Sequence, residues 1–209
     1  MIISIFGATG MVGRQLVIQA LHNGHTVKAF GRNVFTTRFE EDKNLELVQG
    51  ALFDADQVYK TLQGCDAVLS ALGGAFDGSE KTRSLGMKNI VTQMEKAGVK
   101  RIIAVGGKGV LDSGEGDMIM ESPLYPRQYI AVGVEHFKAL EHLRSSSLDW
   151  TFVAPPDIID AEATGIFQTA ADILPVPNKD KINAGDLAMF MVNELTKNAF
   201  VRSRVGISN

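Results

Sequence analysis

A short apolar run that breaks into closely spaced glycines most constrains how this chain can fold. The run at residues 2–6 leads into Gly7-Ala8-Thr9-Gly10-Met11-Val12-Gly13, and apolar residues then recur at helical spacing until Asn23-Gly24. A strand, a glycine-rich turn and a helix in this order are typical of the first βαβ unit of a dinucleotide-binding fold. The sequence therefore predicts a nucleotide site where the first helix begins.

Each glycine of this turn has a predicted task. Gly7 lets the chain leave the strand sharply, Gly10 lets a pyrophosphate approach the backbone, and Gly13 lets the helix pack closely on the sheet. The helix offers unpaired N–H groups and the positive end of its dipole to the phosphates. The spacing is GxxGxxG, one residue longer than the commonest dinucleotide fingerprint.

The composition is that of an ordinary globular protein. Of its 209 residues, 45% are hydrophobic and 22% are charged, and the net charge is −3. We expect one domain over residues 1–209, and the weak negative charge argues against a nucleic-acid or anionic membrane partner. With one cysteine, Cys65, and four histidines, the chain offers neither a disulfide nor a metal-ligand cluster. No apolar stretch is long enough for a signal peptide or a membrane span, so the expected compartment is the cytoplasm.

Strand and helix patterns alternate along most of the chain. Apolar runs predict strands over residues 26–30, 45–49, 66–71, 101–105 and 149–154, and helical spacing predicts helices over 55–62, 82–97, 130–144 and 187–197. Five or six such alternations predict an α/β fold with a doubly wound, Rossmann-like parallel sheet. Residues 204–207 are predicted as an edge strand.

Finer features of this prediction concern single residues and two irregular segments. Asp186 is predicted to cap the last helix, and the helix over residues 82–97 is predicted to turn Leu85, Ile90, Val91 and Met94 toward the core. Residues 110–126 are predicted to form a long mobile loop of the kind that covers a site. Residues 157–181 are predicted to be irregular and to form a small substrate region near the C-terminus.

In a doubly wound sheet the ligand lies beyond the carboxyl ends of the strands, where the strand order reverses. The turns at residues 7–13, 71–74, 105–108 and 155–158, together with Arg32, should therefore surround one crevice. Three of these turns are rich in glycine, which suits a bulky planar ligand pressed against backbone.

The end of the second predicted strand bears on the choice of cofactor. About 20 residues after the glycine turn, an NAD site places a carboxylate on the ribose, whereas an NADP site accepts a 2′-phosphate with arginine. This chain has Arg32 there, Arg38 nearby and no carboxylate until Glu40. A guanidinium matches phosphate geometry, so NADP(H) is the predicted cofactor and NAD(H) the alternative. The alternative is that Arg32 is simply a solvated arginine at the start of a loop.

Five motifs together resemble a known family. They are FGATGMVG, GRN, GCDAVLSALGG, GVKRIIAVGG and LDWTFVAPP. They resemble the atypical short-chain dehydrogenases/reductases, in particular the single-domain NAD(P)H-binding branch with NmrA-like proteins and biliverdin-IXβ reductase/flavin reductases. The resemblance covers nearly the whole chain.

The resemblance implies a set of cofactor contacts. Thr9, Gly10, Met11 and Val12 would hold the pyrophosphate and Arg32 the 2′-phosphate. Leu72 and Gly73 would line the path of the ribose and nicotinamide, and Pro155, Pro156 and Ile158 would flank the nicotinamide. The predicted cofactor-binding set is completed by Gly7, Gly13, Leu52, Ala71, Val105 and Gly106.

The chain also departs from the family at three turns. The family often has Gly-Asp-Val after the third strand, where this chain has Gly50-Ala51-Leu52, so an adenine contact is lost unless Asp54 replaces it. The turn after the fifth strand has Gly106-Gly107 instead of a serine or threonine. Asp157 follows the double proline, where the flavin reductases carry histidine. These departures weaken the case for flavin or biliverdin as the substrate.

The usual catalytic pair of this superfamily is missing. No tyrosine is followed four residues later by lysine, which would favour the phenolate. Tyr129, Gly133, His136 and Leu140 do form one row at helical spacing, and His136 matches a histidine of the flavin reductases. Tyr129 and His136 are therefore the candidate catalytic residues, with two packing residues as the alternative.

Two classes of function follow from these observations. The first is an NADPH-dependent oxidoreductase that reduces a small planar acceptor, a flavin, quinone or carbonyl compound, with water supplying the proton. The second is a non-catalytic NADP(H) sensor of the NmrA type. An epimerase or dehydratase is disfavoured because those activities normally use the missing tyrosine and lysine. The expected partner is a small-molecule substrate, and the oligomeric state stays open.

Overall fold

A mixed sheet of eight strands runs through the molecule in the order β3-β2-β1-β4-β5-β6-β10-β8. In this computed structural model, which describes residues 1–209, all neighbouring strands are parallel except β10 and β8. The strands are β1 (Ile2–Phe6), β2 (Thr26–Gly31), β3 (Leu45–Gln49), β4 (Ala67–Ser70), β5 (Arg101–Val105), β6 (Asp149–Ala154), β8 (Gln168–Ala171) and β10 (Ser203–Ser208). The predicted doubly wound α/β fold is confirmed.

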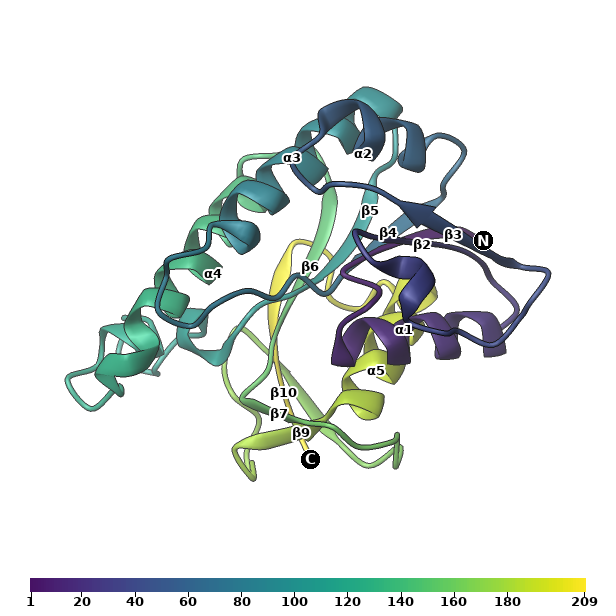
Figure 1. Cartoon of the computed structure of the whole chain (residues 1–209). Coiled ribbons are helices and arrows are strands. Elements are labelled where there is room, and N and C mark those ends of the chain that lie inside the picture. The colour runs from purple at the N-terminus through teal and green to yellow at the C-terminus, as the bar shows by residue number, and fades with distance from the viewer.

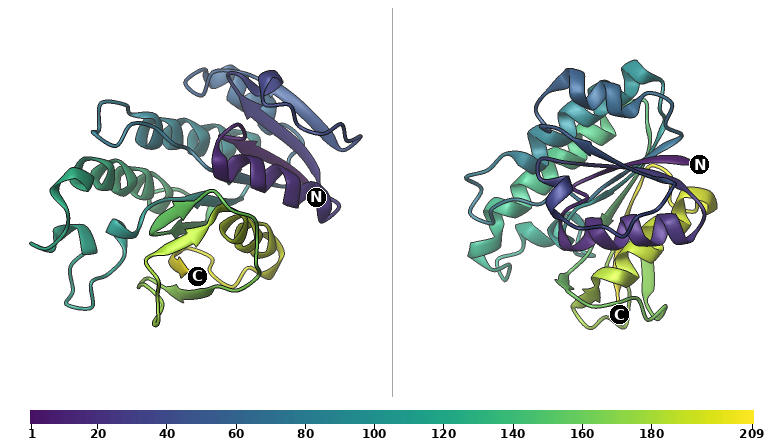
Figure 2. Two further views of the ribbon diagram at one scale, coloured as in Figure 1. Left: turned by 60° about the horizontal axis from the view of Figure 1, so that its bottom comes forward. Right: turned by 45° about the vertical axis from the view of Figure 1, so that its right-hand side comes forward.

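Helices cover both faces of this sheet (Figures 1 and 2). One face carries α1 (Met11–His22) and α5 (Ala184–Lys197), which lie side by side. The other carries α2 (Ala55–Leu62), α3 (Thr82–Ala97) and α4 (Ile130–Arg144). Each α-helix prediction is confirmed to within a few residues.

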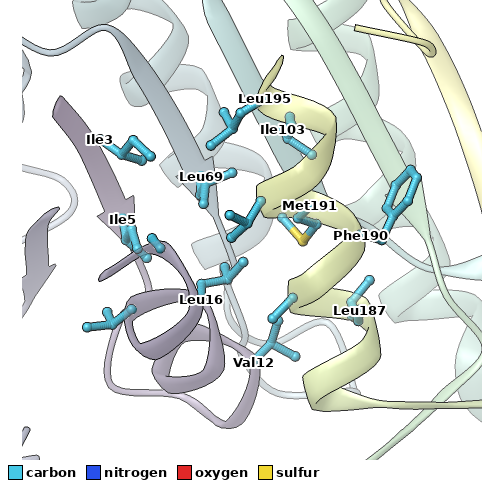
Figure 3. Packing of buried hydrophobic residues seen from close by; sticks show 14 of the residues in the cluster. Ile3, Ile5, Val12, Leu16, Leu69, Ile103, Leu187, Phe190, Met191 and Leu195 are labelled. Carbon is cyan, nitrogen blue, oxygen red and sulfur yellow. The ribbon is translucent and has the colours of Figure 1, made fainter. Parts of the chain in front are cut away.

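Two hydrophobic cores fill the space between these layers. Figure 3 shows the first, in which Val12 and Leu16 of α1 and Leu187 of α5 meet beneath Ile5 of β1. The second packs α2, α3 and α4 on the opposite face, around large buried side chains such as Phe152. The strands are apolar on both faces for this reason, as expected of a covered parallel sheet.

The predicted apolar side of α3 is wrong at one residue. Ile90, Val91 and Met94 are buried, but the Leu85 side chain is 49% exposed. The buried side begins instead with Arg83, which is only 7% exposed. A charged side chain therefore occupies the first turn of the buried stripe.

The strand order reverses between β1 and β4, because the chain runs outward from β1 to β3 and then returns to β4. The carboxyl ends of β1, β4, β5 and β6 consequently meet at one edge of the sheet. This is the place where doubly wound sheets bind their ligands.

The C-terminal third differs most from the sequence-based expectation. β10 is no edge strand: it pairs in parallel with β6 and antiparallel with β8. Residues 157–181 are not irregular throughout, since they contain β7 (Asp157–Ile159) and β8, and β7 pairs with β9 (Lys181–Asn183). These strands are three or four residues long, too short to leave a clear alternation in the sequence.

Asp186 is not the cap of α5, because the helix begins at Ala184 and its cap position is Asn183. The buried Asp186 carboxylate instead accepts hydrogen bonds from the backbone of Thr164 (2.8 Å) and Gly165 (2.7 Å) and from the side chain of Asn209 (2.7 Å). It thereby ties the start of α5 to a distant loop and to the end of β10.

The segment at residues 110–126 has more structure than expected. Two short 3-10 helices, Lys108–Val110 and Ile119–Glu121, lie within or next to it, and Asp112 bridges to Met118. Arg204 of β10 donates hydrogen bonds to the Val110 carbonyl (2.7 Å) and the Asp112 carboxylate (2.9 Å). This anchoring by a residue far away in sequence could not be read from the local composition.

Candidate functional site

A cavity of about 720 Å³ opens at the point where the strand order reverses. Its walls come from the start of α1, the ends of β4, β5 and β6, the first turns of α3 and α4, and the segment at residues 105–129. The volume lies within the range of roughly 300–1,000 Å³ that is typical of ligand sites.

Most of the predicted cofactor-binding residues line this cavity. They are Gly10, Met11, Val12, Ala71, Leu72, Gly73, Val105, Gly106, Pro155, Pro156 and Ile158. These residues come from turns that are far apart in the chain, and the fold brings them together as the sequence predicts.

The start of α1 has the properties of an anion site. Gly10 occupies the cap position, and no side chain caps the helix, so its first N–H groups have no side-chain acceptor. Gly10, Met11 and Val12 line the cavity at this point. A Cβ added to Gly10 would lie 3.5 Å from the Gly7 carbonyl oxygen, an ordinary contact. The fold therefore does not require glycine at this position, and the absence of a side chain there leaves room for a ligand.

Gly7 and Gly13 do not line the cavity, but both are required by close packing. A Cβ at Gly7, whose φ is +79°, would lie 2.4 Å from the Ala71 carbonyl oxygen, and one at Gly13 would lie 2.0 Å from the Gly7 carbonyl oxygen. Gly7 thus forms the turn next to β4, and Gly13 brings α1 against the turn. Both positions match their predicted tasks.

Thr9 and Arg32 are not among the residues that line the cavity, and the two lie near each other at the end of β2. A Cβ at Gly31 would lie 3.1 Å from the Thr9 methyl, so the glycine turn touches the residue just before Arg32. Arg32 is exposed, and Gln49 holds its backbone carbonyl at 3.0 Å. Arg38 lies elsewhere, in a second hollow of about 460 Å³ together with Arg14 and His22.

Leu52 also lies outside the cavity wall. Its side chain packs on α3, where a Cβ at Gly86 would lie 2.4 Å from Leu52 Cδ2. Asp54 does not replace the missing aspartate of the family, because its carboxylate accepts a hydrogen bond from Gln57 N at 3.0 Å as the cap of α2. The departure from Gly-Asp-Val therefore has no substitute here.

The two candidate catalytic residues both line the cavity at its α4 end. Tyr129 caps α4, and His136 lies two turns further along the same side. A Cβ at Gly107 would lie 3.2 Å from His136 Nε2, so the imidazole occupies the space that a serine after β5 would use. Gly133 lies between them and faces Met120, whose sulfur would be 3.1 Å from an added Cβ.

The environment of His136 determines its protonation. Burial, and after it the positive charge of Arg83, lowers the pKa of His136 from 6.5 to about 3. The side chain retains some exposure, and this exposure faces the cavity. At neutral pH His136 is therefore an uncharged imidazole, which can accept or donate a hydrogen bond but is no imidazolium acid.

Several cavity residues escaped the sequence analysis. Arg83, Phe76, Tyr125 and Asp180 all line the cavity, and Asp180 forms an ion pair with Lys108 of the predicted turn after β5. Burial, with a smaller effect of Tyr129, raises the pKa of Tyr125. Arg83 could have been found as the one charge on the buried stripe of α3, whereas the others lie on loops without a periodic pattern.

The described residues form neither a metal centre nor a membrane-spanning helix. No group of three or more His, Cys, Asp or Glu side chains is placed to hold a metal ion. None of the helices combines the length and apolar character that crossing a membrane requires.

Comparison with known proteins identifies the family. The family described as NAD(P)H-binding matches residues 7–198, which is most of the chain. This protein belongs to that family. The resemblance to atypical short-chain dehydrogenases/reductases is thereby confirmed.

Three known proteins are similar to this chain over nearly its whole length. The uncharacterized protein YwnB of Bacillus subtilis is 26% identical over 92% of this chain and 91% of its own length. A crystal structure of a candidate exported protein from Burkholderia pseudomallei is 34% identical, with a TM-score of 0.86 and 100% of both chains covered. A candidate NADH-flavin reductase from Streptococcus pneumoniae is 26% identical, with a TM-score of 0.85 over 100% of this chain and 99% of that one.

The geometry of the cavity suits the nicotinamide dinucleotide for which the family is named. The uncapped start of α1 suits a pyrophosphate, and the cavity continues from there past the ends of β4, β5 and β6. The chemistry of these walls, backbone N–H groups followed by apolar and glycine-rich turns, is that of a dinucleotide site.

Proposed function

We propose that this protein is an NADPH-dependent oxidoreductase that reduces a small planar acceptor, of the flavin, quinone or carbonyl class. The observation that carries the proposal is the cavity, which extends beyond the turns expected to hold the cofactor and reaches Phe76, Tyr125 and Tyr129. These aromatic walls offer a place for a second planar molecule next to the nicotinamide.

The preference for NADPH over NADH is part of this proposal. Arg32 forms none of the protein's ion pairs, so its guanidinium is available to a phosphate. No carboxylate occupies the position that would bind two ribose hydroxyls.

The residues of the chain would chiefly position the reactants. NADPH, when bound, would supply a hydride to the acceptor, and one proton from water would complete the two-electron reduction and leave NADP⁺. Gly106 and Gly107 line the cavity beside β5, and their missing side chains let Phe152 and His136 pack directly against the backbone there. Pro155 and Pro156 add a rigid part of the wall. The uncharged His136 can hold a hydrogen bond to the acceptor or to the water that gives the proton.

Oxidation of NADPH against a panel of quinones, flavins and aldehydes tests the proposal. We expect turnover with at least one planar acceptor and slower turnover with NADH. No oxidation with any member of the panel, from a protein that binds NADPH, would overturn the oxidoreductase and favour the second candidate.

That second candidate is a non-catalytic NADP(H) sensor. It is favoured by the absence of a serine after β5 and of the tyrosine–lysine pair. A sensor would bind NADPH and NADP⁺ with different affinities and change its contact with a partner. A sensor would differ from the reductase in that it shows no preference for any acceptor.

A further inference from the structure

Arg83 places a buried positive charge at the acceptor end of the cavity. It lies in the first turn of α3, lines the cavity and is only 7% exposed. Its Nη1 donates to the Ala75 carbonyl and its Nη2 to the Gly74 carbonyl, both at 3.0 Å, while Nε has no partner. The guanidinium thus donates hydrogen bonds only to backbone carbonyls.

No carboxylate lies within ion-pair distance of Arg83. Glu135 and Glu80 act on its charge from farther away, and burial lowers the pKa of Arg83 more than these two carboxylates raise it. The two acidic residues nearby are engaged elsewhere. Glu135 accepts a hydrogen bond from Ser84 at 2.5 Å and pairs with Lys81 at 3.3 Å, and Glu80 accepts one from Ala75 N at 3.1 Å. Buried charges in proteins are normally paired, so the missing counterion points to a ligand.

The surroundings of Arg83 limit what that ligand can be. The Phe76 ring lies 5.7 Å from the guanidinium, and the Tyr129 ring lies 6.4 Å from that of Phe76. Val132 and the uncharged His136 complete this end of the cavity. One cation among aromatic and apolar walls suits a flat ring with a single anionic group.

We propose that the acceptor is a planar aromatic molecule with a carboxylate, and that Arg83 binds this carboxylate. This inference rests on the proposed function, which places an acceptor at this end of the cavity. The other source of an anion is a phosphate of the cofactor. The pyrophosphate is expected at the start of α1 and the 2′-phosphate at Arg32, whereas α3 lies on the other face of the sheet from α1 (Figure 1), so the acceptor is favoured.

Binding of two unreactive probes tests the proposal without turnover. Calorimetry with 2-naphthoate and 2-naphthamide, on protein saturated with NADP⁺, compares one ring with and without the charge. We expect wild type to bind the carboxylate about tenfold more tightly or better, as a charge-assisted hydrogen bond provides. Equal affinity for the two probes, or no binding of either, would overturn the proposal.

Three variants test whether Arg83 causes the preference for the carboxylate probe. Arg83→Gln should abolish it, Arg83→Lys should keep part of it, and the exposed Arg127→Gln, a matched loss of one positive charge near Tyr129, should keep it in full. A preference that survives Arg83→Gln would overturn the assignment. If Arg83→Gln does not fold, as judged by circular dichroism, the wild-type comparison and Arg83→Lys decide.

NADPH titration of the same variants separates the two sources of the anion. If Arg83 binds the acceptor, Arg83→Gln leaves NADPH affinity unchanged, whereas a loss of NADPH affinity would assign Arg83 to a cofactor phosphate and overturn the proposal. If the carboxylate preference holds but no acceptor is reduced, the proposed reductase function fails while the anion site stands.

Discussion

Gly10 differs from the two other glycines of its turn in what a side chain would meet. At Gly10 an added Cβ has only an ordinary contact at 3.5 Å, whereas at Gly7 and Gly13 it would collide with backbone oxygens at 2.4 Å and 2.0 Å. We therefore predict that Gly10→Val folds but loses NADPH affinity by several kcal/mol, because the branched side chain projects into the phosphate site. Titration of the purified variant with NADPH measures this.

The control is Gly13→Ala, which should instead lower the free energy of unfolding, because α1 must move away from the turn. Unchanged NADPH affinity in a folded Gly10→Val protein would contradict the placement of the pyrophosphate.

Arg32 should decide the choice between cofactors. Its exposed guanidinium can contact a 2′-phosphate, and solvent and salt weaken such a contact. We predict that Arg32→Ala weakens NADPH binding by about 1.5–3 kcal/mol, or one to two decades in affinity, and hardly changes NADH binding. Calorimetry with both cofactors, at low and high salt, measures the difference.

Arg38 provides the matched comparison for Arg32, since it lies in the second hollow. Arg38→Ala should therefore have a smaller effect than Arg32→Ala. Equal affinities of wild type for NADPH and NADH would remove the basis for assigning NADP(H).

Tyr129 and His136 can be separated by turnover once a substrate is found. If Tyr129 donates the proton, Tyr129→Phe should lower kcat by about 10²-fold or more and leave cofactor affinity unchanged. His136 is uncharged at neutral pH because burial and Arg83 lower its pKa to about 3. His136→Gln, which keeps hydrogen-bonding capacity, should therefore cost less than Tyr129→Phe. Full activity in both variants would mean that the proton comes from solvent alone.

At the scale of elements, the start of α5 depends on one buried carboxylate. Burial alone would raise the pKa of Asp186, but hydrogen bonds from Asn209, Gly165 and Thr164 outweigh it and hold the pKa below its ordinary value. Asp186→Asn replaces one acceptor oxygen by a donor that faces other donors. We predict a loss of about 2–4 kcal/mol in the free energy of unfolding, measured by urea denaturation.

A second readout distinguishes Asp186→Asn from a general loss of packing. Asp186 holds the segment between β7 and β9, and Ile158 and Asp180 at the two ends of this segment line the cavity. NADPH affinity should therefore fall as well. Asn209→Ala, which removes only one of the partners, should have a smaller effect of the same kind. An Asp186→Asn protein as stable as wild type would show that the network contributes nothing.

The elements up to β6 could be predicted because each leaves a local signal. Their strands are apolar runs between glycines, and α3 and α4 have regular apolar spacing with a stop such as Gly98. The strands after β6 could not, since β7, β8 and β9 are short. β8 pairs only with β10, and β7 pairs only with β9, which lies more than 20 residues further along the chain. The function of Asp186 depends on Thr164 and Asn209, whose proximity no local pattern encodes.

The same limit applies to the candidate site. Glycines at the ends of strands predicted most of the cavity wall, because strand ends converge in any doubly wound sheet. Arg83, Phe76 and Tyr125 reach the wall through loop and helix geometry that depends on tertiary packing. Leu52 was assigned to the cofactor by resemblance, but here it packs on Gly86.

At the scale of the whole molecule, stability should fall as the pH is lowered. His136 has its ordinary pKa of 6.5 when unfolded and a pKa of about 3 when folded. Between these values only the unfolded chain takes up the proton, so the free energy of unfolding decreases steadily from about pH 6.5 toward pH 3. The lowered pKa of Asp186 acts in the same direction at the acidic end.

Urea denaturation at pH 7.5 and pH 5 tests this dependence. His136→Gln should reduce the loss of stability between the two values, whereas His22→Gln, at the exposed end of α1, should not. A wild-type stability that does not change between pH 7.5 and pH 5 would mean that the imidazole is well hydrated in solution.

The position of β10 between β6 and β8 has a consequence for the synthesis of this protein on the ribosome. β8 emerges before α5 and β10, yet its only strand partner is β10. The edge of β6 meanwhile stays open, because β10 also fills that place. Nascent chains with an unpaired edge are prone to aggregate, so the interval between the emergence of β6 and of β10 is when this protein most needs a chaperone.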